Sequence, residues 1–330
     1  MSSMCTCPRL PWIAGWSRRG KKIDLTVVYE PWVVEHFSGY LCIDEIYDGP
    51  YCIFYAVDPV LRMRVAFQIS EEATEAECRR FLRYLADMGL EVKGITTDGS
   101  HLYPKLIGDI FPGATHQSCV FHVIKELNLL VLRALAGFRK SLPKPAPGKR
   151  GRRRKGEKRP REDPLVRLKR DVWENRHLWV RHHLTVAQRR RLARIIRGRP
   201  LLRGLRELVD LVYALFDRRC RTATAIRKLE RLRRHRLFKA FPQLEVIRRK
   251  LMSPNLEKAL LFLDDSMLEA TSNAVERENR RHRKRQKTVY RARTRRTIAG
   301  RVRFSMLHDL QPDVLMLPEN RYRLPDSKAG

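Results

Sequence analysis

The stretch that most constrains the fold of this chain is GYLCIDEIYDGPYCIFYAVDPVLRMRVAFQIS, residues 39–70. It holds three apolar runs rich in β-branched and aromatic residues, the residue types that favour strands. DGP and DPV separate the runs, and glycine, proline and aspartate favour tight turns there. We therefore expect three consecutive strands that pair as antiparallel neighbours.

Helices and further strands are expected to alternate after this stretch. Between Glu72 and Met88 the apolar residues recur near helical spacing, and Gly89 stands where a C-cap glycine ends a helix. There follow a strand that ends at Asp98, a short helix near 101–108, a short strand near 114–120 and the helical pattern VFHVIKELNLLVLRALAGF. This order predicts a mixed α/β sheet, in which crossover helices lead to added strands.

The charge of the chain is divided unevenly. Residues 1–137 hold 14 Lys and Arg against 16 Asp and Glu, whereas residues 138–330 hold 55 against 20. The whole chain has a formal net charge of +33, and such an excess implies a polyanionic partner, most simply nucleic acid. The second half is therefore expected to carry the contacts with that partner.

The second half begins with a basic segment that cannot build a core. Residues 138–163 contain four prolines, three glycines and twelve Lys and Arg, a composition typical of a flexible linker. Residues 164–268 then show helical periodicity without clear strands. No stretch approaches the roughly 20 apolar residues that a membrane span needs, so we expect a soluble, intracellular protein with no membrane partner.

Two aspartates stand out among the expected strands. Asp44 lies inside the first strand, in LCIDEIY, and Asp98 ends the fourth. A carboxylate in a buried strand must be paired or bind a metal, because uncompensated burial is costly. If the first and fourth strands are neighbours, the two carboxylates converge. The alternatives are an edge-strand acid for Asp44 and a turn or helix N-cap for Asp98.

A third acid is expected on a late helix, in EATSNAVERENRRHRKRQ, residues 269–286. Thr271, Ser272 or Asn273 can cap this helix, on which Glu276 and Asn279 share a face while Glu278 points elsewhere. Three carboxylates would suit a hard cation such as Mg²⁺. The alternative for Glu276 is a surface acid that pairs with the surrounding arginines.

Taken in order, these motifs resemble those of the DDE transposases of prokaryotic insertion sequences, in the Mutator-like group. The resemblance rests on CIDEIYDG, TTDGSHLYP, HQSCVFHVIKEL and TSNAVERENR, and it runs from about residue 39 to residue 308. It implies a ribonuclease H-like catalytic core with a helical insertion domain before the last catalytic acid. It assigns the catalytic and metal-binding triad to Asp44, Asp98 and Glu276, with two Mg²⁺ or Mn²⁺ ions.

The resemblance also matches Cys119 and His122 to a C-x-x-H motif, for which a structural or a DNA-facing role is expected. From the residues themselves, a packed thiol and a partly satisfied imidazole at a strand-to-helix junction are the simpler interpretation. Two such ligands alone do not make a tetrahedral zinc site. The role of this pair is therefore left open between these alternatives.

The basic stretch at residues 277–303 begins on the helix of the third acid. Arginines and lysines at this density repel one another unless phosphates lie nearby, so we expect duplex DNA along this face. The alternative is a solvated surface helix. The expected DNA-binding residues are Arg280, Arg281, Arg283, Lys284, Arg285 and Lys287, together with Arg152, Arg153 and Arg154 in the linker.

The sequence thus predicts six regions. They are a short N-terminal segment (1–38), the first part of the catalytic core (39–137), the basic linker (138–163), the helical insertion (164–268), the final catalytic helix with its basic face (269–308) and a tail (309–330). Family members carry a longer DNA-binding region before the first Asp, whereas 43 residues precede it here. We expect either a truncated or split copy, or recognition of the ends by the insertion.

The expected function is that of a transposase that cuts and transfers DNA strands at the ends of an insertion sequence. Its partners would be double-stranded DNA, as transposon ends and as target, and a second copy in a homodimer on that DNA. Such a protein would work in a prokaryotic cytoplasm, associated with the nucleoid. The alternatives are a catalytically silent, transposase-derived DNA-binding protein and a ribonuclease H-like nuclease or resolvase.

Overall fold

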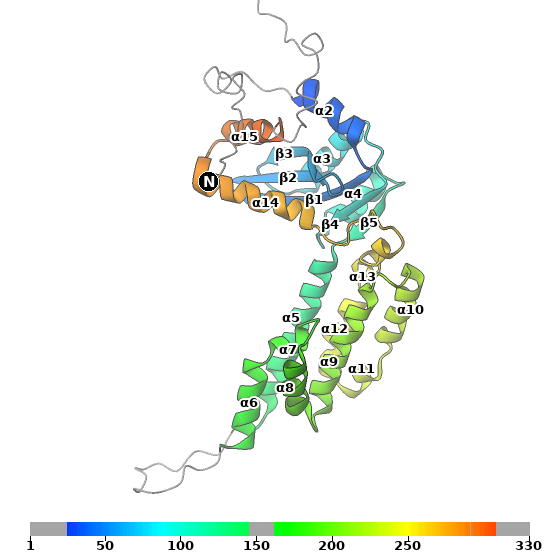
Figure 1. Cartoon of the computed structure of the whole chain (residues 1–330), viewed down its shortest axis with the longest axis vertical. Helices are drawn as coiled ribbons and strands as arrows, with labels where there is room; N and C mark the ends of the chain where they lie inside the picture. Colours follow the sequence, from blue (N-terminus) through cyan, green and yellow to red (C-terminus); the bar gives the residue numbers. More distant parts are fainter. Residues whose placement is uncertain (1–24, 145–161, 291, 308–330) are drawn as a thin grey trace, which may run out of the picture. The chain divides into compact units, whose positions relative to one another are not determined.

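The computed structural model of the chain describes residues 25–144, 162–290 and 292–307 (Figure 1). The chain divides into two compact units, each assembled from separate segments of the sequence. The first unit comprises Met1–Lys93, Lys105–Gly113 and Asn273–Gly330, and the second comprises Gly94–Pro104 and Ala114–Ser272. The chain therefore leaves the first unit and returns to it at the helix expected to carry the third acid.

Three antiparallel strands form the centre of the first unit, as the sequence predicts. They are β1 (Tyr40–Asp48), β2 (Tyr51–Asp58) and β3 (Met63–Ser70). In their register Asp44 lies opposite Tyr55, and Tyr55 lies opposite Phe67. Side chains of directly opposed residues project from the same face of a sheet, so these three share one face.

Helices cover both faces of these strands. On one face α3 (Glu75–Asp87) packs through Phe81, whose ring lies 5.7 Å from that of Phe54. Thr74 caps the start of α3, and Gly89 follows its end with a positive φ of 80°, as predicted for a C-cap glycine. On the other face α14 (Asn273–Arg285) lies along β1 and β2 (Figure 1).

The remaining elements of the first unit are α2 (Leu25–His36), most of α4 (Tyr103–Ile110), a π-helical turn η4 (Gln286–Tyr290) and α15 (Arg295–Leu307). Helix α15 packs against β3 and α2. The Tyr29 hydroxyl of α2 donates to the Arg64 backbone carbonyl at 2.5 Å, which fastens α2 to β3. The sequence predicts only a short segment before residue 39, so α2 is an addition.

The second unit contains two parallel strands, β4 (Gly94–Thr97) and β5 (Thr115–Ser118). Three antiparallel strands in the first unit and a parallel pair in the second, with helices between them, confirm the predicted mixed α/β class. Helix α5 (Val120–Ser141) follows β5 directly. It continues four residues into the predicted linker, and α6 begins at Pro164.

Helices build the rest of the second unit, with no strand among its described residues from 162 onward. Trp179 is fully buried at its centre and donates to the Leu202 carbonyl, while the Arg206 guanidinium donates to the carbonyls of Leu178, Trp179 and Arg181. The elements are α6 (Pro164–Glu174), α7 (His177–Val180), α8 (Val186–Ile196), α9 (Pro200–Tyr213), η1 (Ala214–Phe216), α10 (Thr222–Arg233), α11 (Arg236–Ala240), η2 (Pro242–Leu244), α12 (Glu245–Leu251), α13 (Pro254–Lys258) and η3 (Leu261–Leu263).

None of the described helices combines the length and the apolar character that crossing a membrane requires.

Candidate active site

The structure joins the strand of the first acid to the late helix. The Asn279 side-chain amide on α14 donates to Asp44 Oδ2 on β1 at 2.7 Å. Asn279 is buried, with 4% of its surface exposed, and Asp44 is half-buried. A charge-assisted hydrogen bond of this kind orients a carboxylate and holds the two elements together.

Glu276 lies one turn before Asn279, on the same face of α14, as the i, i+3 spacing predicts. Its side chain is partly exposed, and Arg280 approaches its carboxylate at 3.5 Å. Because Asn279 contacts Asp44, this face of the helix turns toward β1. The structure therefore brings two of the three predicted acids to one side of the β1–β3 strands.

Glu278 occupies a different environment, as expected. It is 8% exposed, and its carboxylate lies 3.8 Å from the Arg64 guanidinium and 2.6 Å from that of Arg281. Arg64 is itself buried and donates to the side chain and the carbonyl of Ser305 on α15. This buried network ties β3 to α14 and α15.

A second contact between β1 and α14 was not predicted. His282 accepts or donates at both ring nitrogens, with Nδ1 3.0 Å from the Tyr55 hydroxyl and Nε2 2.8 Å from Asp48 Oδ2. Gln286 also donates to Asp48 Oδ2. The spacing of two acids in the sequence could have indicated this contact. Asp44 and Asp48 are four residues apart on a strand, so their side chains project from the same face of the sheet.

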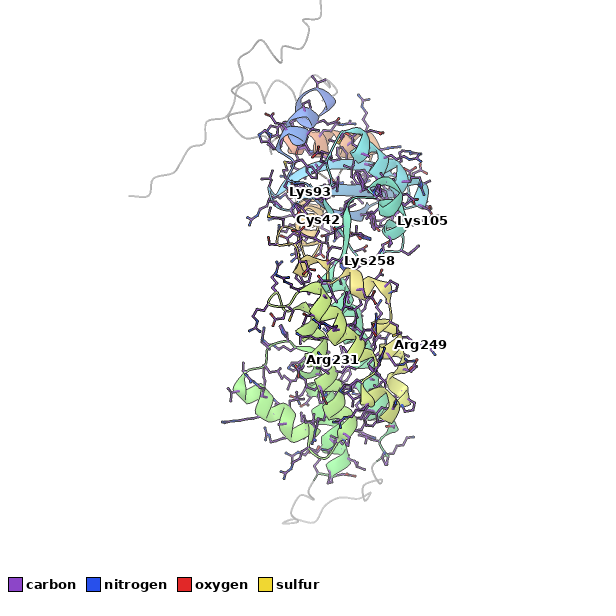
Figure 2. The ribbon with its side chains drawn as sticks, turned by 90° about the vertical axis from the view of Figure 1, so that its right-hand side faces the viewer. Cys42, Lys93, Lys105, Arg231, Arg249 and Lys258 are labelled. Carbon is purple, nitrogen blue, oxygen red and sulfur yellow. The ribbon has the colours of Figure 1, made fainter. Side chains whose placement is uncertain are left out.

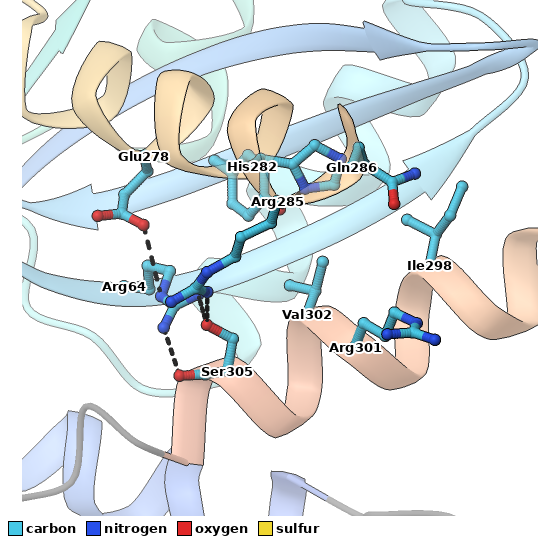
Figure 3. Close-up of a pocket in the computed structure, with 10 residues that line it drawn as sticks. Arg64, Glu278, His282, Arg285, Gln286, Ile298, Arg301, Val302 and Ser305 are labelled. Atoms are coloured by element: carbon cyan, nitrogen blue, oxygen red, sulfur yellow. Dashed lines mark hydrogen bonds and ion pairs between the residues drawn. The ribbon is translucent and has the colours of Figure 1, made fainter. Parts of the chain in front are cut away.

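These side chains line a small pocket among β2, β3, α14 and α15 (Figure 3). In Figure 3 the Arg64 and Arg285 guanidinium groups both point at Ser305. Burial in this region raises the pKa of the Tyr55 hydroxyl well above its ordinary value, with Arg64 opposing the shift. The lining residues are Tyr55, Arg64, Glu278, His282, Arg285, Gln286, Ile298, Arg301, Val302 and Ser305.

Asp98 belongs to the second unit, where it follows β4. Its Oδ1 accepts from the Ser100 backbone amide at 2.8 Å, which is the turn-type contact weighed as an alternative. Next to it, Thr97 Oγ1 lies 2.9 Å from His116 Nε2. Burial, aided by Lys258, lowers the pKa of His116 from 6.5 to about 4. The convergence of Asp98 with Asp44 and Glu276 stays a prediction.

Cys119 and His122 also lie in the second unit, close to Asp98 in the fold. The Cys119 amide donates to the Thr97 carbonyl at 2.8 Å, and the buried Cys119 thiol accepts from the amide and the hydroxyl of Ser272. Burial raises the pKa of this thiol, but hydrogen bonds from His122 and Ser272 outweigh it, so the pKa is lowered overall. The pair therefore fixes the junction between β5 and α5.

The predicted DNA-binding residues on α14 do not all face solvent. Arg280, Arg283 and Lys284 are exposed, as is Lys287 on the following turn. Arg281 is exposed but pairs with Glu278, and Arg285 is half-buried and donates to Ser305. Arg152, Arg153 and Arg154 lie outside the described residues.

The oxygen atoms around Asp44 suit a hard cation. Asn279 Oδ1 is buried and has no hydrogen-bond partner among the described residues, although the amide nitrogen of the same side chain contacts Asp44. An orphaned amide oxygen beside a carboxylate belongs to the donor set that Mg²⁺ prefers. Within residues 25–144, 162–290 and 292–307, however, no three His, Cys, Asp or Glu side chains gather as a ready metal-binding group.

Comparison with known families supplies an independent finding. Residues 41–251, well over half of the chain, match the model of the family DDE_Tnp_ISL3, whose description is Transposase. The matched segment contains Asp44 and Asp98 and ends before Glu276. This family differs from the Mutator-like group, so that assignment and its C-x-x-H motif receive no support. No curated protein matches the chain.

Proposed function

Because the chain belongs to the ISL3 family of DDE transposases, we propose that it catalyses metal-dependent cleavage and strand transfer of DNA at the ends of an insertion sequence. The observation that carries the proposal is the hydrogen bond between Asn279 and Asp44. It attaches α14, which lies beyond the matched segment, to the strand of the first acid. Glu276 lies one turn earlier on the same face of α14, which supports it as the third acid of the triad.

In this proposal Asp44, Asp98 and Glu276 hold two Mg²⁺ or Mn²⁺ ions on a ribonuclease H-like sheet. The hydrogen bond from Asn279 to Asp44 and the buried Asn279 Oδ1 support this assignment. Such ions, when bound, polarise the scissile phosphate and stabilise the entering and leaving oxygens of an in-line displacement. Asn279 Oδ1 would accept a hydrogen bond from water at this site.

The side chains of β1, β2 and α14 have different roles in this proposal. Asn279 orients the Asp44 carboxylate, and the Asp48, His282 and Tyr55 contacts hold the next turn of α14 on the strands. The exposed Arg280, Arg283 and Lys284 face solvent along the same helix, where they can contact DNA phosphates. Their partner would be duplex DNA, both as transposon end and as target, held by a homodimer with one copy at each end, in a prokaryotic cytoplasm.

The test is a set of isosteric substitutions. Asp44→Asn, Asp98→Asn and Glu276→Gln remove one negative charge each and should abolish cleavage of a labelled element end in Mg²⁺ or Mn²⁺, while duplex binding persists. Glu45→Gln is the matched control. This neighbour on β1 projects from the opposite face, where burial and then the charge of Glu45 raise the pKa values of Cys52 and Cys78. Cleavage should survive that change.

A pre-cleaved end with a free 3′-hydroxyl separates the competing functions. Joining of that end to a target plasmid identifies a transposase, and its loss in the three acid variants assigns the same site to both steps. Hydrolysis without joining would favour a ribonuclease H-like nuclease or resolvase. Tight binding with neither reaction would mean a silent DNA-binding descendant.

A further inference from the structure

The second unit carries a solvent-open cleft between α6 and α8 that the α14 site does not involve. Its volume is about 440 Å³, and the buried Leu168 and Ile195 form its apolar floor. Four of the eight lining residues are arginines and one is acidic. The lining residues are Pro164, Arg167, Leu168, Asp171, Arg191, Arg194, Ile195 and Arg199.

The positive charges in this cleft are only partly compensated. Arg167 approaches Asp171 at 3.8 Å, and Arg199 donates to the carbonyls of Ile195 and Arg197. Arg191 and Arg194 are exposed, and within the described residues their side chains form neither an ion pair nor a hydrogen bond. Two guanidinium groups, each with five donors, therefore remain available at the wall of a concave surface.

The sequence of the α8 side of the cleft contains no acid that offsets this charge. Residues 175–206 hold ten arginines, no lysine and no Asp or Glu. A cleft lined by charge of one sign focuses the electrostatic potential and concentrates counter-ions. Arginine rather than lysine suits phosphate, because its planar fork binds two oxygens at once.

We propose that the α6–α8 cleft binds the sugar–phosphate backbone of duplex DNA. The inference rests on the proposed transposase function, which makes DNA the relevant polyanion. Apart from Asp171, the charged side chains of the cleft are donors only, and donors to phosphate position a duplex without reading its sequence. The cleft is therefore a second, sequence-independent contact, carried by the helical unit and separate from α14.

The experiment is a salt titration of binding to random-sequence duplex DNA with the full chain. Arg191→Gln/Arg194→Gln removes two phosphate contacts, so the slope of log K against log[salt] should become shallower by about 1.8, at about 0.9 per contact. At 0.1 M salt the affinity should fall about 60-fold, since each contact contributes a factor of about eight. Arg191→Lys/Arg194→Lys keeps the charge and should retain most of the slope.

Arg227→Gln/Arg231→Gln is the matched control. It also removes two exposed arginines, one turn apart, from a helix of the same unit, α10; Arg231 is labelled in Figure 2. This control should leave the slope nearly unchanged. Equal losses in the two double variants would show a diffuse charge effect and overturn the proposal, as would a cleft variant that binds like the unchanged chain.

Two further measurements identify the kind of nucleic acid that the cleft binds and distinguish this proposal from the proposed transposase function. Double-stranded RNA of equal length should respond less than DNA; if only RNA binding falls, the cleft serves RNA and the proposal is wrong. With saturating DNA, the cleft variant should recover cleavage, whereas Asp44→Asn should not. If Asp44→Asn still cleaves, the proposed active site fails and the cleft result stands.

Discussion

The Asn279 side-chain amide hydrogen-bonds the Asp44 carboxylate from a position 235 residues further along the chain. The amide nitrogen donates to the carboxylate, and the amide oxygen is buried with no partner in the described part of the chain. The Asn279 side chain thus orients the Asp44 carboxylate and also carries a buried amide oxygen. Outer contacts of this kind typically contribute a factor of about 10 to 100 to metal affinity or activity.

We therefore predict that Asn279→Ala lowers the cleavage rate by about 10- to 100-fold without abolishing it. Asn279→Asp should lower it further at neutral pH, because a second carboxylate replaces a donor next to Asp44. The measurement is single-turnover cleavage across a range of Mg²⁺ concentrations. A rate unchanged by either substitution would remove Asn279 from the site.

Substitution of Glu278 should lower stability, whereas substitution of Glu276 should stop cleavage, although the two residues are only two positions apart. Glu278→Leu leaves the buried Arg64 guanidinium without its carboxylate, at a cost of about 3 kcal/mol in the free energy of unfolding, measured by urea denaturation. The cost stays at the lower end of the usual range because Arg64 keeps its bonds to Ser305. Glu276→Gln should change stability little and stop cleavage.

Tyr55→Phe should destabilise the first unit by about 1 to 2 kcal/mol, because it leaves His282 Nδ1 without its hydroxyl partner. Tyr47→Phe is the control, since Tyr47 is 60% exposed on the neighbouring strand. That change should stay within about 0.5 kcal/mol. Urea unfolding of both variants measures the difference, and equal effects would contradict the role of the Tyr55 hydroxyl.

His116 predicts a pH dependence of stability. Its pKa is about 4 in the folded chain and near 6.5 otherwise, so only the unfolded chain gains this proton as the pH falls from 6.5 to 4. The free energy of unfolding should therefore decline as the pH falls from 6.5 to 4. His116 should cause no further change in it below pH 4 or above pH 6.5. His116→Gln should flatten this part of the profile relative to His177→Gln, which replaces an exposed histidine. Parallel profiles would refute the assignment.

The local sequence pattern was sufficient to predict β1, β2, β3 and α3 of the first unit. The turns after Asp48 and Asp58, the helical spacing of residues 72–88 and the position of Gly89 each depend on neighbours in sequence, and all are found as predicted. The shared face of Glu276 and Asn279 follows from helical geometry in the same way. The choice of Asp44, Asp98 and Glu276 among the 36 Asp and Glu residues of the chain required the family resemblance.

Contacts between distant segments could not be predicted from the sequence. Arg285 sits in a run of basic residues that reads as a uniform DNA-binding face, yet it turns inward to Ser305. His282, in the same run, meets Asp48 and Tyr55 instead of solvent. One signal was present: Arg64 is a lone basic residue in an apolar strand, a position that requires a buried partner. The cleft between α6 and α8 depends on how two helices pack, which periodicity does not fix.

The first unit is assembled from three separate segments of the chain, and this has a consequence for the timing of synthesis. At the usual pace of roughly 5 to 20 residues per second, Asp44 is added to the growing chain about 12 to 47 s before Asn279. During that interval β1, β2 and β3 have one face without its helix. A nascent chain interrupted before residue 273 contains the strand acid and lacks all of α14. Completion of translation, and not the earlier appearance of the sheet, is thus the event that seals this face of the protein.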